Sequence, residues 1–115
     1  MQRIIIFFGN KIIEFFDSLD IKTKEKITYV IDIIKFTPIV SEKFLKHIEG
    51  TDGLYEIRIK VGTNIYRIFC CFDKGNLVVL LNGFQKKDQK TPRNEILLAQ
   101  KLKQEYLNHP KNDGK

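Results

Sequence analysis

The chain has 115 residues, of which 43% are hydrophobic and 30% charged, so it is long enough to bury the core of one domain without disulfide or metal staples. Its formal net charge of +6 favours an anionic partner, such as nucleic acid, an anionic membrane or an acidic protein. The apolar run at residues 4–8 is too short for a signal peptide or a membrane span, so we expect a cytoplasmic protein.

The first third of the chain predicts one strand and two helices. Residues 3–8 (RIIIFF) are β-branched and aromatic, as in a buried strand. Asn10 is a candidate N-cap for a short helix that reaches Leu19. A second helix is expected over residues 22–36 and ends before Pro38. Its apolar stripe consists of Ile27, Val30, Ile31 and Ile34.

The rest of the chain predicts a β-meander and a last helix. Residues 41–48 indicate a short helical turn and residues 49–53 a connector. Three strands follow, joined by tight turns at residues 62–64 and 73–76. Thr91 matches an N-cap, with proline at the first helical position after it. We expect one domain over residues 1–108 and a flexible tail over residues 109–115.

The two turns predict which side chains meet across the sheet. If Gly62 and Thr63 form the first turn, Arg58 lies opposite Arg67. If Lys74 and Gly75 form the second, Arg67 also lies opposite Asn82. One face of the sheet then carries the charges, and helices cover the other. The predicted core face consists of Tyr55, Ile57, Ile59, Tyr66, Ile68, Cys70, Phe72, Val79 and Leu81.

This arrangement concentrates positive charge. Residues 54–93 contain eight Lys and Arg against three Asp and Glu. Two arginines directly opposed on a sheet repel, which favours a phosphate ligand between them. Two alternatives involve no phosphate ligand. In one, Glu56 pairs with the arginines in a solvated network, and in the other, the loop of residues 85–93 serves only solubility.

The sequence lacks the signatures of several enzyme classes. Cys70 and Cys71 are adjacent in a predicted strand, where their side chains point to opposite faces, and the two histidines are far apart. We therefore expect neither a metal nor another cofactor. Glycine-rich phosphate loops and serine hydrolase elbows are also missing from the sequence.

Three segments resemble the HigB-like branch of the RelE/ParE toxin superfamily. They are LYEIRI (residues 54–59), YRIF (residues 66–69) and LLNGFQKKDQKTP (residues 80–92), the last followed by Glu95 and Ile96. The resemblance implies an α+β fold in which a curved antiparallel sheet is packed on one face by helices. It also implies the toxin of a type II toxin–antitoxin system, active as a metal-independent endoribonuclease on mRNA at the ribosome.

The same resemblance implies partners and roles. The partners are a HigA-like helix-turn-helix antitoxin and mRNA on the ribosome, with no membrane. Catalysis is expected of Arg58, Arg67, Lys87 and Lys90, and RNA binding of Lys60, Asn82, Lys86 and Arg93. Many relatives have histidine where Asn82 stands, and an asparagine cannot transfer a proton there.

Two other functions remain open at this stage. One is a non-catalytic inhibitor of DNA gyrase, as in the ParE arm of the superfamily. The other is a phage-derived accessory protein that binds nucleic acid without cutting it.

Overall fold

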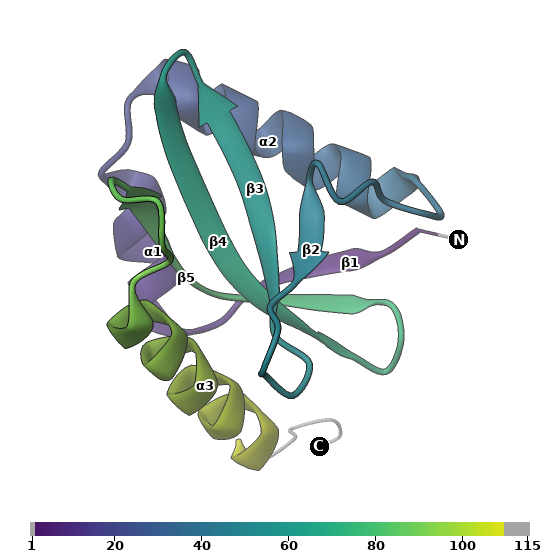
Figure 1. Cartoon of the computed structure of the whole chain (residues 1–115). Coiled ribbons are helices and arrows are strands. Elements are labelled where there is room, and N and C mark those ends of the chain that lie inside the picture. The colour runs from purple at the N-terminus through teal and green to yellow at the C-terminus, as the bar shows by residue number, and fades with distance from the viewer. Residues whose placement is uncertain (1, 110–115) are drawn as a thin grey trace.

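The structure is a computed structural model, and it describes residues 2–109. A five-stranded sheet runs through the molecule in the order β1-β5-β4-β3-β2, with three helices around it (Figure 1). The elements in chain order are β1 (Ile4–Phe7), α1 (Gly9–Asp17), α2 (Ile21–Phe36), β2 (Leu45–His47), β3 (Tyr55–Val61), β4 (Asn64–Asp73), β5 (Leu77–Lys86) and α3 (Arg93–Asn108).

The expected α+β fold is confirmed, and the sheet is mixed rather than wholly antiparallel. Strands β2 to β5 pair antiparallel, whereas β1 pairs parallel with β5, with Ile4 beside Leu77 and Phe7 beside Leu80. No tight turn joins β1 to β5, so chain connectivity does not force them to run in opposite directions. An edge position beside β5 lets the apolar β1 bury one side of its backbone.

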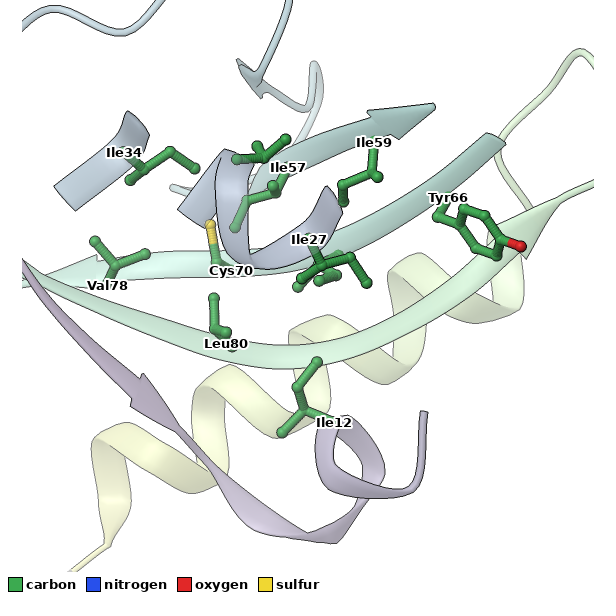
Figure 2. Close-up of a cluster of buried hydrophobic side chains, with 11 residues drawn as sticks. Ile12, Ile27, Ile34, Ile57, Ile59, Tyr66, Cys70, Val78 and Leu80 are labelled. Carbon is green, nitrogen blue, oxygen red and sulfur yellow. The ribbon is translucent and has the colours of Figure 1, made fainter. Parts of the chain in front are cut away.

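Helices cover both faces of the sheet, not one face as expected. The larger core packs α1 and α2 on one face, where Ile12, Ile27 and Ile34 meet the strands (Figure 2). Helix α3 packs on the other face through Ala99 and Leu102. In Figure 1 the tip of the β3–β4 hairpin rises away from α3, so this helix covers only part of its face.

The register of the first hairpin is as predicted. Val61 pairs with Asn64 around a two-residue turn, and Gly62 has a φ of 63°, which glycine adopts without strain. Arg58 therefore lies opposite Arg67.

The register of the second hairpin differs from the prediction. Its loop has three residues, because Asp73 pairs with Leu77, and a bulge then leaves Leu81 unpaired between two ladder positions. Together these features move the partner of Arg67 from Asn82 to Phe84. Val79 and Leu81 consequently face α3 instead of the larger core.

Residues 41–48 also differ from the prediction, because they form a turn and then strand β2 rather than a helical turn. Leu45 pairs with Ile57, and the Arg58 N–H donates to the Phe44 carbonyl at 2.8 Å. The exposed edge of β3 offers backbone partners that outweigh a weak local helix preference in a segment this short.

The helix starts lie close to those expected. Helix α1 begins at Gly9 rather than after an Asn10 cap. Helix α2 is capped by Asp20, whose side chain accepts from the Thr23 N–H, and the cap residue of α3 is Pro92 rather than Thr91.

Among residues 2–109, no helix has the length and apolar character needed to cross a membrane. Most of the expected tail, residues 110–115, lies outside the described residues.

Candidate phosphate-binding site

The face of the sheet that carries α3 also carries a grid of side chains from β3, β4 and β5. One row joins Arg58, Arg67 and Phe84, because each is paired with the next across the ladder. A side chain at one row position is roughly 5 Å from its partner at Cβ, so the two arginines are direct neighbours. The flanking rows are Lys60, Ile65 and Lys86 on one side, and Glu56, Phe69 and Asn82 on the other.

Glu56 bridges the two arginines. Its Oε2 lies 3.4 Å from Nε of Arg58 and its Oε1 lies 3.8 Å from Nε of Arg67. The pairing of Glu56 with the arginines that was considered from the sequence is therefore present, but it is largely buried rather than solvated, and one carboxylate serves two guanidinium groups. A net positive charge remains at this point on the face.

Arg67 is the buried member of the pair. Only 6% of the residue is exposed, and its Nε has no hydrogen-bond partner among the described residues. One terminal nitrogen donates to the Tyr66 carbonyl at 3.1 Å. Burial lowers the pKa of the Arg67 guanidinium, and the charge of Glu56 opposes that shift. The Nε is held only by the long ion pair with Glu56, so a phosphate oxygen can compete for this guanidinium.

A pocket of about 320 Å³ opens beside this pair. Within the part of the chain that the structure describes, five cationic side chains and no acidic side chain line it. The lining residues are Lys26, Lys43, Phe44, Arg58, Ile59, Lys60, Ile65 and Arg67. Three predicted residues, Arg58, Lys60 and Arg67, therefore meet at one cavity.

The sequence prediction missed Lys26 and Lys43. Lys26 lies on α2, and Lys43 lies just before a strand that was predicted as a helical turn. Both are far from residues 54–93 along the chain, and no local motif marks either of them. Only the pairing of β2 with β3 and the packing of α2 bring them to the pocket.

The remaining predicted lysines lie beyond the arginine row. Lys86 ends β5 and pairs with Ile65, so it shares the face of Arg67 one row away. Lys87 and Lys90 are exposed in the loop before α3, and Arg93 is exposed at the first position of that helix. None of these four forms an ion pair with another described residue.

Asn82 is buried against the start of α3. It is 2% exposed, and its side-chain amide donates to the Glu95 carbonyl at 3.2 Å and to the Glu95 carboxylate at 3.1 Å. These bonds tie β5 to the first turn of α3. Burial argues against the predicted RNA contact of Asn82 and indicates a structural role.

Tyr66 lies on the larger core face, as the first register predicts, with its ring against Phe15. His47 is exposed on β2, and its Nε2 lies 3.2 Å from the Thr51 carbonyl oxygen. His109 follows α3, beside the ring of Phe8. Neither histidine lines the pocket.

Residues 2–109 contain no group of three or more His, Cys, Asp or Glu side chains that could hold a metal ion. Cys70 and Cys71 are both buried, on opposite faces of the sheet. Burial raises the pKa of both thiols, so they are held in the neutral form.

Comparisons with known proteins agree with this architecture. Residues 14–104 match the profile of a family described as phage-derived protein Gp49-like (DUF891). A search of curated protein sequences gives no significant match.

Two solved structures have a similar fold. One is the E. coli toxin RelE in the free state, as a mutant with two arginines changed to alanine. It is 14% identical, with a TM-score of 0.56, over 72% of this chain and 82% of its own. The other is a chain of the archaeal RelE–RelB complex from Pyrococcus horikoshii OT3. It is 22% identical, with a TM-score of 0.55, over 79% of this chain and 100% of its own.

Proposed function

The chain belongs to the phage-derived Gp49-like family, and from this membership and its RelE-like fold we propose that it is the toxin of a type II toxin–antitoxin system. We propose further that it is a HigB-like, metal-independent endoribonuclease that cuts mRNA on the ribosome. The observation that supports the ribonuclease most is the pair of Arg58 and Arg67, which share a single carboxylate, that of Glu56, and line a cationic pocket.

In the proposed reaction the 2′-hydroxyl of one nucleotide attacks its own 3′-phosphate. The bond from phosphorus to the 5′-oxygen of the next nucleotide breaks, which leaves a 2′,3′-cyclic phosphate and a 5′-hydroxyl. Negative charge builds on the phosphate oxygens in the transition state. Arg58 and Arg67 stabilise that charge, because each guanidinium can donate two parallel hydrogen bonds and stays protonated.

The surrounding cations hold the RNA backbone. Lys60 lines the same pocket as the arginines, and Lys86 extends the face toward the end of β5. Lys87, Lys90 and Arg93 continue the positive charge into the loop and the start of α3. These exposed side chains add affinity for phosphate in a salt-dependent manner.

Proton transfer needs groups other than Asn82 and Glu56. Asn82 cannot titrate, and Glu56 is engaged by both guanidinium groups. Lys87 and Lys90 are exposed and form no ion pair with another described residue, so their ammonium groups are the candidates in this chain for the general acid that protonates the leaving 5′-oxygen. Ribosomal RNA can supply a further group.

We propose a helix-turn-helix antitoxin, HigA-like, as the protein partner. One similar structure is a RelE–RelB complex, which supports a partner of this general kind. A net charge of +6 suits both RNA and an acidic antitoxin segment.

Induced expression in bacteria tests the proposal. The wild-type chain should arrest growth and produce transcripts cut inside translated codons, as mapped by sequencing RNA ends. Arg67→Ala should abolish both effects, since it removes the buried guanidinium. Lys101→Ala, on an exposed position of α3, is the matched control and should remain toxic. Circular dichroism of each purified variant checks that it is folded.

Other outcomes would contradict the ribonuclease. If growth stops while the RNA stays intact, and Arg67→Ala is still toxic, the chain would be a gyrase inhibitor. A supercoiling assay would then detect that inhibition. Harmless expression of the soluble wild-type chain would indicate a non-catalytic protein that binds nucleic acid.

A further inference from the structure

The cationic pocket extends around a free edge of the sheet. The ladder between β2 and β3 ends where Leu45 pairs with Ile57, and one more hydrogen bond joins the Arg58 N–H to the Phe44 carbonyl. Strand β3 continues to Val61 without a partner from β2. The pocket lies beside this uncovered stretch, since Arg58, Ile59 and Lys60 all line it.

Two lysines reach the pocket from outside the meander. The Lys26 ammonium lies 5.3 Å from the centroid of the Tyr29 ring on α2, and the Lys43 ammonium lies 5.4 Å from that of Phe44. Neither lysine forms an ion pair with another described residue. Their charges are therefore not neutralised locally, and a mobile anion is the natural counter-ion.

The pocket is also lined by a cationic side chain that is almost fully buried. Arg67 is only 6% exposed and lines the pocket, and the Glu56 carboxylate lies 3.8 Å from its Nε. This ion pair is too long to be a hydrogen bond, so an anion in the pocket can compete with Glu56 for the guanidinium. The apolar lining comes from Phe44, Ile59 and Ile65.

We propose that this pocket is a subsite for the nucleotide next to the scissile phosphate, so that single-stranded RNA crosses the free edge of β3. Lys26 and Lys43 bind the phosphate of that nucleotide, and Phe44 contacts its base or sugar. Cationic side chains beside an aromatic ring are the combination by which proteins hold single strands without reading sequence. This inference rests on the proposed function, because it takes RNA as the ligand of the same site.

Binding of a short RNA that carries 2′-fluoro groups tests the subsite without cleavage, since the attacking hydroxyl is missing. Fluorescence anisotropy over a range of salt concentrations measures its affinity. The double variant Lys26→Ala, Lys43→Ala should bind roughly tenfold more weakly, with the salt slope reduced by about 0.7 for each lost phosphate contact. The matched control, Lys11→Ala, Lys101→Ala, removes two exposed lysines outside the pocket and should bind like wild type.

The variant Phe44→Leu tests whether the pocket binds a nucleotide or only a phosphate group. We expect it to weaken RNA binding severalfold while leaving the affinity for inorganic pyrophosphate unchanged. Equal weakening of both ligands would mean that the variant disturbs the phosphate groups and not a base contact, and would overturn the nucleotide assignment.

The outcomes also separate this inference from the proposed function. If the double lysine variant binds the RNA as tightly as its control does, the subsite is refuted, whether or not the wild type cuts RNA. If the wild type never cuts RNA but binds it with the expected lysine dependence, the ribonuclease is refuted, and the pocket is a binding site for single-stranded RNA with no scissile phosphate beside it. A wild type that does not bind the RNA at all refutes the subsite.

Discussion

At the scale of single residues, Glu56 decides how the arginine pair behaves in the absence of substrate. Its two carboxylate oxygens lie within 3.8 Å of the guanidinium nitrogens of Arg58 and Arg67, and its side chain is only 13% exposed. A buried charge that loses its partner is strongly destabilising. Glu56 therefore offsets the free-energy cost of burying the charge of Arg67 until a bound anion becomes the counter-ion.

Glu56→Gln should lower the free energy of unfolding by about 1–3 kcal/mol, because Arg67 keeps its charge and loses its counter-ion. Pyrophosphate should restore more stability to this variant than to the wild type, since it binds the vacated guanidinium groups. Urea unfolding with and without pyrophosphate measures both effects. Glu49→Gln, at an exposed turn position without an ion pair among residues 2–109, is the control. Equal stability of the two variants would contradict this role.

Sequence reasoning found some of the site residues and missed others for identifiable reasons. Arg58 and Arg67 could be placed together because a two-residue turn containing Gly62 fixes the register between them. Lys26 and Lys43 could not be found, since long-range packing alone brings them to the pocket. The burial of Asn82 could not be predicted, because nothing local shows that α3 covers it.

At the scale of elements, the packing of α1 on β5 depends on a glycine beside the site. A Cβ atom at Gly83 would lie 2.5 Å from Cδ2 of Phe15, which is too close for any real contact. Phe15 in turn packs against Tyr66 on β4, the neighbour of Arg67 in sequence. The absence of a side chain at Gly83 therefore allows α1 to approach the strands that carry the arginines.

Gly83→Ala should destabilise the protein by about 1–3 kcal/mol, because the added methyl group forces Phe15 or the strand to move. In a Phe15→Ala background the same change should cost much less, since the ring is gone. A double-mutant cycle measured by thermal unfolding gives the coupling between the two positions. Additive effects would show that Phe15 is not the obstacle.

Helix α3 is anchored at its C-terminal half by Tyr106, whose hydroxyl donates to Asp73 at 2.8 Å. Burial, helped by this carboxylate, raises the pKa of Tyr106 to about 12, so its protonated form is favoured in the folded state. The unfolded chain loses this proton near pH 10. The contribution of Tyr106 to stability is therefore complete below pH 10 and is lost as the pH rises toward 12.

Tyr106→Phe should remove this part of the pH dependence. The difference in unfolding free energy between wild type and variant should be constant below pH 9.5 and shrink between pH 10 and 12. Chemical unfolding at each pH measures the difference. A difference that grows with pH would contradict the direction of the shift.

The second hairpin shows where element-level prediction fails. A two-residue and a three-residue turn are both compatible with the sequence DKGN, and the structure uses three residues, with Lys74 and Gly75 at positive φ. The bulge at Leu81 has no sequence signal that could be recognised beforehand. A one-residue shift exchanges the faces of a strand, which is why Val79 and Leu81 were assigned to the wrong side.

At the scale of the whole molecule, the α+β class could be predicted because helical and strand periodicities are separated along the chain. The sequence prediction placed helices on one face only, although the sequence of β4 indicates burial on both faces. Its residues 68–71 (IFCC) are apolar in succession, which is typical of a strand buried on both sides. The arginine pair and the pocket lie toward the turn of the β3–β4 hairpin, whose tip rises away from α3 (Figure 1).

We propose that RNA is cut through 2′-hydroxyl attack at the arginine pair. The most direct test incubates the purified chain with mRNA on translating ribosomes and identifies the new ends by mass spectrometry. We expect 2′,3′-cyclic phosphate and 5′-hydroxyl ends with the wild type and none with Arg67→Ala. Intact mRNA, or cuts that carry 3′-hydroxyl and 5′-phosphate ends, would contradict it.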